Sequence, residues 1–459
     1  MGPRHHEPQA LLDRPSREER YRSGKALRAK IPRSSHASWN PPRDRPDPIG
    51  LLETSNAPRV SHLVPIRYGR MSLSPFAFLR GSANVMARDL AFTPRTGFRV
   101  QLGGDAHLSN FGIFGTPERN EVFDLNDFDE TLPGPWEWDV KRLATSLVLA
   151  ARRNGFTRSH GRRAALRAVQ SYRESMNSYA FRGYLDIWYS HLDPALVARQ
   201  GMRQASRVIG RYARKARSRT SLQAFPRLVG RVGGGYRIRD QPPLIVHYSD
   251  QRVEELSHEL FARYLPTLPE ERRMLLEHYH LVDVAQKVVG VGSVGTRCSI
   301  ILLVGDRDTD DPLILQVKQA LASALEPYAG PSIYTDHAQR VVVGQHLIQQ
   351  SSDSFLGWGS IRSRDYYVRQ LRDWKYSAEP SSMGPKRLIG HGELCGAALA
   401  RAHARTGDPA AISGYLGTKD TFDRAVAAFA EAYADQSERD YNELLTAIQK
   451  GHIHAEVDV

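Results

Sequence analysis

Cysteine is nearly absent from this 459-residue sequence, and long apolar runs are absent altogether. The two cysteines, Cys298 and Cys395, have no partner at the spacing of a metal-binding motif, and two thiols cannot make the multi-bridge framework of small secreted domains. No apolar run approaches the roughly 18 residues that a membrane-spanning helix needs. The first residues also lack the apolar core of a secretory signal, so we expect a cytoplasmic protein without membrane insertion.

Acidic residues are outnumbered by basic ones, at 50 Asp and Glu against 63 Lys and Arg, which gives a formal net charge of +13. Such an excess could serve a nucleic acid or a phosphate-rich ligand. Much of it falls in residues 1–45 and 203–231, and no basic motif interleaved with aromatic residues accompanies it. We therefore interpret the excess as solvated surface and expect no nucleic-acid partner. The sequence does not indicate an oligomeric state.

The distribution of apolar residues predicts an α+β protein with four segments. Residues 1–57 are rich in Pro, Arg, His and Ser, with little hydrophobic period, and are expected to be a mostly disordered basic arm. Residues 58–278 are expected to form a helical lobe that carries the acidic loops. Residues 279–378 are expected to form a small β-rich lobe, and residues 379–459 to add helices that complete the helical lobe.

Within these segments the hydrophobic period and the Gly and Pro positions predict individual elements. Helices are expected at 74–92, with Ser74 and Pro75 as cap and first turn, and at 136–155, 159–212, 253–278, 336–350, 392–407 and 423–447. Strands are expected at 98–104, 121–125, 282–289, 297–304, 313–317 and 366–371. The three consecutive strands that begin at Val282 suggest an antiparallel meander.

The stretch GGDAHLSNFGIFGTPERNEVFDLNDFDE, residues 103–130, concentrates acidic and amide side chains between short apolar runs. So many polar groups are costly to bury unless they bind something, and a divalent metal is the obvious candidate. If the strand ends before Asp105 and Asp127 lie side by side, they bring an Asp, the amide of Asn110 and a second Asp over one cleft. Phosphoryl transfer needs this equipment, although Asp and Asn also favour ordinary turn and capping positions.

A glycine-rich stretch follows much later, where Gly290, Gly292 and Gly295 form a GxGxxG pattern that also contains Ser293. A dinucleotide-binding fold would place a helix after these glycines, but residues 297–304 have the composition of a strand. A strand, glycine turn and strand instead match the loop that covers the phosphates in kinases. Lys318, at the end of the next strand, matches the kinase lysine that contacts the α- and β-phosphates.

GDAHLSN followed by VFDLNDFD resembles the catalytic and metal-binding segments of the aminoglycoside phosphotransferase and choline kinase branch of protein-kinase-like folds. The downstream PGPWEWDVKRLA is similar to the short helix start of that branch, which carries Asp139. The resemblance implies a kinase that binds ATP with Mg²⁺ or Mn²⁺. The roles it implies are catalytic base for Asp105, metal ligands for Asn110 and Asp127, a second metal contact for Asp129, and support of the loop for His107 and Asp139.

The order of these parts is unusual, because the glycine turn and lysine follow the catalytic loop, whereas in ordinary kinases they precede it. LARAHARTG, residues 399–407, also resembles the helix that precedes the catalytic loop in small-molecule kinases. Both observations predict a circularly permuted two-lobed kinase-like fold. Kinases pair the strand lysine with a helix glutamate, but residues 336–350 contain none, so Glu326 is the nearest candidate partner of Lys318.

Most of the patterned region, roughly residues 64–447, also resembles the bacterial domain of unknown function 2252 family. The strings SPFAFLRGSA, GDAHLSNFG, FDLNDFDETLPGPWEWDVKRLA, KVVGVGSVGTR and YYVRQLRD support this resemblance. It supplies no substrate. The chemistry favours phosphoryl transfer to a small-molecule hydroxyl or amine; the alternatives are nucleotidyl transfer, a nucleotide-binding pseudokinase, and a metal-dependent hydrolase.

Overall fold

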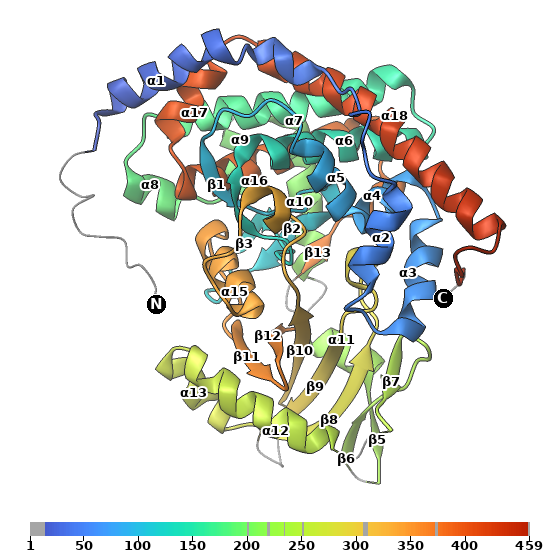
Figure 1. Cartoon of the computed structure of the whole chain (residues 1–459). Coiled ribbons are helices and arrows are strands. Elements are labelled where there is room, and N and C mark those ends of the chain that lie inside the picture. The colour runs from blue at the N-terminus through green and yellow to red at the C-terminus, as the bar shows by residue number, and fades with distance from the viewer. Residues whose placement is uncertain are drawn as a thin grey trace.

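A computed structural model describes residues 14–199, 202–217, 221–233, 235–249, 252–305, 311–371 and 375–457. The fold is mixed α+β, with antiparallel pairing in its sheets. Figure 1 shows a broad layer of helices above a six-stranded sheet, with shorter strands between the two. No helix in the described ranges is both long and apolar enough to cross a membrane.

The helices are α1 (Arg17–Lys30), α2 (Pro48–Asn56), α3 (Val64–Met71), α4 (Pro75–Gly81), α5 (Ala83–Leu90), α6 (Trp136–Arg153), α7 (Arg158–Tyr179), α8 (Tyr184–Tyr189), α9 (Pro194–Arg199), α10 (Arg203–Arg217), α11 (Ser221–Leu228), α12 (Val253–Tyr264), α13 (Glu270–Glu277), α14 (Glu326–Ala329), α15 (His337–Ile348), α16 (Pro385–Thr406), α17 (Pro409–Leu416) and α18 (Thr421–Gln449).

The strands are β1 (Arg99–Leu102), β2 (Phe111–Gly115), β3 (Glu121–Leu125), β4 (Leu132–Pro135), β5 (Val229–Val232), β6 (Gly235–Ile238), β7 (Ile245–His247), β8 (His280–Lys287), β9 (Cys298–Val304), β10 (Pro312–Ala320), β11 (Gly357–Ile361), β12 (Arg364–Gln370) and β13 (Tyr376–Ser377).

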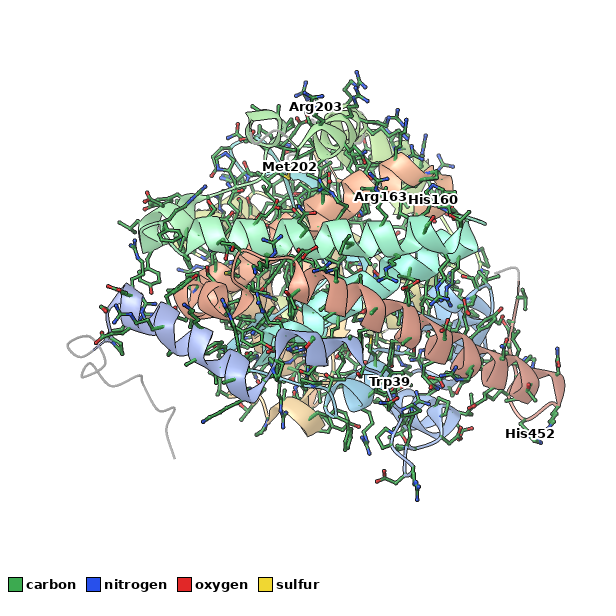
Figure 2. All side chains as sticks on the ribbon, turned by 90° about the horizontal axis from the view of Figure 1, so that it is seen from above. Trp39, His160, Arg163, Met202, Arg203 and His452 are labelled. Atoms are coloured by element: carbon green, nitrogen blue, oxygen red, sulfur yellow. The ribbon has the colours of Figure 1, made fainter. Side chains whose placement is uncertain are left out.

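The helical layer is built around α6, α7, α16 and α18, which pack on one another (Figure 2). Nearly every residue of α6 is buried, including the charged side chains of Glu137, Asp139, Lys141 and Arg142. Close approach of α7 and α16 depends on a glycine, since a Cβ at Gly396 would overlap the carbonyl oxygen of Ala168. The main hydrophobic core runs through these helices. It provides the rigid support on which the acidic loops rest.

The six-stranded sheet has the order β11-β12-β10-β9-β8-β7, and every neighbouring pair is antiparallel. The predicted meander of three strands is confirmed as β8, β9 and β10. The sheet extends beyond the predicted small lobe at 279–378, because its edge strand β7 precedes that range. In the chain order, helix α15 lies between β10 and β11. Helix α12 packs Leu260 and Tyr264 against the apolar face of the sheet, which includes Ile301 and Leu315.

Most of the predicted elements are present, with shifted ends. The predicted helix at 74–92 is interrupted at Ser82, which ends α4 and begins α5, and the Ser74 hydroxyl caps α4 by accepting a hydrogen bond from the Ala77 N–H. The strands before Asp105 and Asp127 belong to different sheets, although their ends lie close together, since a Cβ at Gly103 would lie 2.7 Å from a side-chain carbon of Leu125. Strand β1 pairs with β4, whereas β3 pairs with β2, which the hydrophobic pattern did not reveal.

The prediction of a mostly disordered arm over residues 1–57 is wrong for residues 14–57, and residues 1–13 lie outside the described residues. Ser16 and Glu19 form a capping box at the start of α1. The helix then packs on α17, where Arg28 donates to the carbonyl oxygens of Tyr415 and Gly414. The composition of this segment is too polar for a core of its own, but contacts with the rest of the chain offset its ordering entropy.

Substitution of Gly24 in α1 tests this docking. A Cβ at Gly24 would overlap the carbonyl oxygen of Ala411 in α17. Gly24→Ala should therefore lower the free energy of unfolding by about 1–3 kcal/mol, the usual cost of overpacking, and increase hydrogen exchange in residues 17–30.

Gly210→Ala is the matched control, because nothing lies within 4 Å of a Cβ placed at this second helical glycine. It should be neutral or stabilise the protein by up to about 1 kcal/mol through helix propensity. Equal free energies of unfolding for the two variants would contradict the docking of α1 on α17.

Candidate functional site

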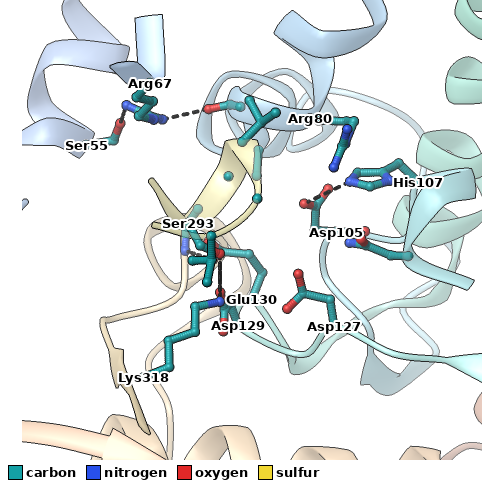
Figure 3. Close-up of a pocket in the computed structure, with 18 of the residues that line it drawn as sticks. Ser55, Arg67, Arg80, Asp105, His107, Asp127, Asp129, Glu130, Ser293 and Lys318 are labelled. Atoms are coloured by element: carbon teal, nitrogen blue, oxygen red, sulfur yellow. Dashed lines mark hydrogen bonds and ion pairs between the residues drawn. The ribbon is translucent and has the colours of Figure 1, made fainter. Parts of the chain in front are cut away.

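A polar cavity of about 190 Å³ lies where the six-stranded sheet meets the helical layer. Three parts of the chain line it (Figure 3): the helical segment of residues 48–90, the acidic loops, and the glycine turn with β10. The predicted residues Asp105, Asn110, Asp127, Asp129 and Lys318 all belong to its lining. Side chains far apart in the sequence therefore meet in one pocket.

Asp105 lies in the loop that leaves β1 and is held in place from two sides. The buried Arg142 guanidinium in α6 forms an ion pair with its carboxylate, and the Asn110 amide donates to its main-chain carbonyl oxygen over 2.8 Å. His107 Nε2 lies 3.6 Å from the second carboxylate oxygen. Burial raises the pKa of Asp105, and the nearby Arg142 charge opposes that rise. A fixed carboxylate with a raised pKa suits a general base.

Asp139 holds the start of the acidic loop in place. Its two carboxylate oxygens accept hydrogen bonds from the main-chain N–H groups of Gly103 and Gly104, over 2.7 and 3.0 Å. His403 in α16 lies 3.3 Å from the same carboxylate. Both residues belong to motifs that the sequence singled out, and both act on the acidic loop without lining the pocket.

Asp127 carries an unmatched polar atom. Its Oδ1 is buried and has no hydrogen-bond partner within the described part of the chain. Burial raises the pKa of Asp127, and the negative charge of Asp129 raises it further. A buried carboxylate oxygen without a partner is costly, and a bound cation would remove that cost.

Asp129 forms an ion pair with the buried Lys318 ammonium, and Ser293 joins them, as Figure 3 shows. The ammonium donates to Ser293 Oγ over 2.6 Å, and Ser293 in turn donates to Asp129 over 3.0 Å. The Tyr367 hydroxyl donates to the other carboxylate oxygen of Asp129 over 2.8 Å. Burial works against ionisation of Asp129, but the Lys318 charge, the hydrogen bonds from Lys318 and Tyr367, and the Arg369 charge together outweigh it and lower the pKa to about 2.

The expectation that Glu326 pairs with Lys318 is wrong, because Asp129 occupies that position. Glu326 Oε1 instead accepts a hydrogen bond from the Ser323 N–H over 3.1 Å, and it lies 4.0 Å from Arg340 Nε. Glu326 is not part of the pocket lining. No sequence motif links Asp129 to Lys318, because the two residues are 189 positions apart.

The glycine turn connects β8 and β9 through a short 3₁₀ helix at Val291–Ser293. Gly290, Gly292 and Ser293 line the pocket, whereas Gly295 does not. Gly295 has a φ of 87°, which favours glycine, and its carbonyl oxygen accepts a hydrogen bond from the Val60 N–H over 2.8 Å. Gly295 therefore shapes the turn and is not placed to contact a ligand.

The segment of residues 48–90 adds pocket residues that the sequence did not single out as functional, chiefly Arg59, Arg67 and Arg80. Arg80 lies in the last turn of α4. It is half-buried beside Asp105, and among the described residues it pairs with no carboxylate. Only the packing of α2, α3 and α4 against the glycine turn could reveal these three residues, because no motif marks them.

A divalent cation could be held by Asn110 and Asp127. The Asn110 amide nitrogen is used by the loop, which leaves its oxygen for a cation, and Asp127 Oδ1 has no partner among the described residues. No group of three or more His, Cys, Asp or Glu side chains in the described ranges is arranged to hold a metal. Mg²⁺ commonly uses one or two carboxylates together with substrate phosphates, so this donor set fits it.

The fold and site thus define a mixed α+β protein with a buried, charged pocket between a sheet and a helical layer. The model of the family described as uncharacterized protein conserved in bacteria (DUF2252) matches residues 59–447, and the chain belongs to this family. No curated protein and no solved structure matches the chain significantly.

A double substitution tests the ion pair between Lys318 and Asp129. Lys318→Met should lower the free energy of unfolding by about 3–5 kcal/mol, because it leaves the Asp129 carboxylate without its partner in a largely buried position. Lys318→Met combined with Asp129→Asn should recover much of this loss. Additive effects of the two single substitutions in chemical denaturation would show that the pair is not coupled.

Proposed function

We propose that this protein is an ATP- and Mg²⁺-dependent phosphotransferase with a circularly permuted, protein-kinase-like fold. The observation that carries the proposal is the meeting of Asp105, Asn110, Asp127, Lys318 and the glycine turn in one pocket. The acceptor would be a hydroxyl or amine of a small molecule.

The arrangement of the sheet supports the kinase-like fold. Strands β8 and β9 flank the glycine turn, β10 carries Lys318, and α15 follows β10. Protein kinases have the same succession: a glycine-rich loop between two strands, a lysine on the third strand and then a helix. The helical layer comes from both flanks of this unit, as a permutation would require.

Each residue of the pocket then has a role in positioning or charge stabilisation, which is what phosphoryl transfer requires. Asp105 accepts the proton of the acceptor group, while Arg142 holds the carboxylate in place. Lys318 and the main-chain N–H groups of the glycine turn bind phosphate oxygens. Asn110 and Asp127 would hold Mg²⁺, with Asp129 as a further contact, and the ion would supply charge neutralisation for the transferred phosphoryl group.

The Lys318 and Asp129 pair also supports a second candidate, nucleotidyl transfer or nucleotide binding without catalysis. Helix α15 contains no glutamate to hold the lysine, and Lys318 forms an ion pair with one of the predicted metal contacts. A conventional kinase needs its lysine and its metal-binding aspartate in separate roles. The mass of the product formed with ATP would distinguish the two reactions, since a nucleotidyl group is far heavier than a phosphoryl group.

Nucleotide binding is tested with the wild type and Asp127→Asn. ATP at a hundred times its dissociation constant should add about 2.7 kcal/mol to the free energy of unfolding of the wild type in the presence of Mg²⁺. Asp127→Asn should lose the Mg²⁺-dependent part of this gain, because it removes the unmatched carboxylate oxygen. The variant without ligand should be at least as stable as the wild type, since it no longer buries that charge.

Thermal unfolding with Mg²⁺ alone, ATP alone and both together gives the comparison. An unchanged melting temperature of the wild type at millimolar ATP and Mg²⁺ would reject the nucleotide site.

Catalysis is tested with Asp105→Asn, which keeps the shape of the side chain and removes the base. Turnover should fall by about a thousandfold, roughly 4 kcal/mol of transition-state stabilisation, with ATP affinity nearly unchanged. In the wild type, turnover should fall as the pH drops through the raised pKa of Asp105, at a higher pH than for an ordinary aspartate. Undiminished turnover in the variant would exclude Asp105 from the mechanism.

A further inference from the structure

Three buried or half-buried arginines from residues 48–90 line the pocket without an ion-pair partner in the described ranges. Arg142 pairs with Asp105, and Lys318 pairs with Asp129. Arg59, Arg67 and Arg80 form no ion pair with any carboxylate in the described ranges of the chain. Guanidinium groups out of water are costly unless an anion compensates them, so this side of the pocket is suited to an anionic ligand.

Arg59 and Arg67 hydrogen-bond only to neutral groups. Arg59 donates to the carbonyl oxygens of Ser55, over 3.1 Å, and Val294, over 2.6 Å. Arg67 is 1% exposed and donates to Ser55 Oγ, the Asn56 amide oxygen and the carbonyl oxygen of Gly81. Burial lowers the pKa of both groups. The Glu130 carboxylate attracts both groups at longer range, but neither forms an ion pair.

Arg80, unlike Arg59 and Arg67, donates no side-chain hydrogen bond to another described residue. Its Nε is buried and has no partner among the described residues. Its Nη2 lies 3.9 Å from the position that a Cβ at Gly290 would take, and its carbonyl oxygen lies 3.2 Å from the corresponding position at Gly292. The guanidinium points toward Asp105 in Figure 3. It thus lies between the turn that would cover the phosphates and the carboxylate that would activate the acceptor.

We propose that Arg80, supported by the charges of Arg59 and Arg67, binds the terminal phosphate of a nucleoside triphosphate. This inference rests on the proposed function, because it places the transferred phosphoryl group between the glycine turn and Asp105. Lys318 binds the inner phosphates, and Arg80 binds the terminal phosphate of the same polyphosphate chain. An arginine contributed by the segment before the catalytic loop stabilises charge on the phosphoryl group during transfer.

The charge of the lining favours a polyphosphate over an additional anionic group on the acceptor. Four carboxylates line the pocket, and five cationic side chains face them: Arg59, Arg67, Arg80, Lys318 and Arg369. One Mg²⁺ adds two positive charges, and the four negative charges of ATP then bring the site close to neutrality. A second phosphate on the acceptor would leave an uncompensated negative excess in a buried site.

The test compares the affinities of ATP and ADP, each with Mg²⁺, for the wild type, Arg80→Gln and Arg80→Lys by isothermal titration calorimetry. Arg80→Gln should weaken ATP binding by about 10- to 100-fold, the range expected for hydrogen bonds between charged groups, and change ADP binding by less than about threefold. Arg80→Lys should retain part of the ATP affinity, because it keeps the charge and loses the fork of donors. Thermal unfolding without ligand verifies that each variant is folded.

Arg88→Gln is the matched control, since Arg88 lies in the neighbouring helix α5, stacks over Phe92 and does not line the pocket. It should leave both affinities unchanged. Equal losses of ATP and ADP affinity in Arg80→Gln would overturn the proposal by assigning Arg80 to the inner phosphates. Unchanged affinities for both would also overturn it and assign the arginines to an anionic acceptor.

Failure of the proposed function has a different signature, because the wild type then binds neither ATP nor ADP. Inorganic tripolyphosphate separates the two questions in that case. Binding of tripolyphosphate that is lost in Arg80→Gln and kept in Arg88→Gln would preserve the phosphate site without a nucleotide. No binding of tripolyphosphate to the wild type would overturn it.

Discussion

The ion pair between Lys318 and Asp129 is the contact on which the pocket depends. It joins the third strand of the sheet meander to the acidic loop, and Ser293 extends the same contact to the glycine turn. Lys318 is 3% exposed, so solvent cannot compensate its charge if Asp129 is removed. Sheet, turn and loop are therefore held at fixed separations by one group of hydrogen-bonded charges.

Some of the other charges in the pocket are also compensated by an opposite charge nearby, but others are not. Arg142 compensates Asp105, and the half-buried Arg369, which donates to Gln316, lies close enough to Asp127 to influence its pKa. Asp127 nevertheless keeps an unmatched oxygen, and the arginines of residues 48–90 keep unmatched positive charge. The carboxylate excess lies toward Asp127 and the positive excess toward Arg80. A cation and a polyanion bound together would compensate both the negative charge near Asp127 and the positive charge near Arg80. A single ion of either sign would compensate only one of them.

Local patterns in the sequence were sufficient to predict the strands of the meander and the helices α6, α16 and α18. They also singled out the loop residues Asp105, Asn110 and Asp127, which the fold brings into one pocket. Period-two alternation and helical spacing involve residues that are close in the sequence, so both patterns can be recognised before the fold is known. The partner of Lys318, the pocket arginines and the order of residues 14–57 depend on contacts between distant segments. Glu326 was predicted as the partner of Lys318 because it is close in the sequence, whereas the fold places Asp129 beside Lys318.

The order of the segments along the chain also bears on how the pocket forms during synthesis. Asp129 leaves the ribosome 189 residues before Lys318, and the acidic loop is thus complete while its partner has not been made. Until Lys318 is made, Asp129 lacks its ion-pair partner, whereas Asp105 already has Arg142 of α6 nearby in the sequence. The sheet strands that carry Lys318 are made after the acidic loop, and α16 and α18, which pack on α7, are made last. Closure of contacts this far apart is slow, and the finished pocket is a late product of folding.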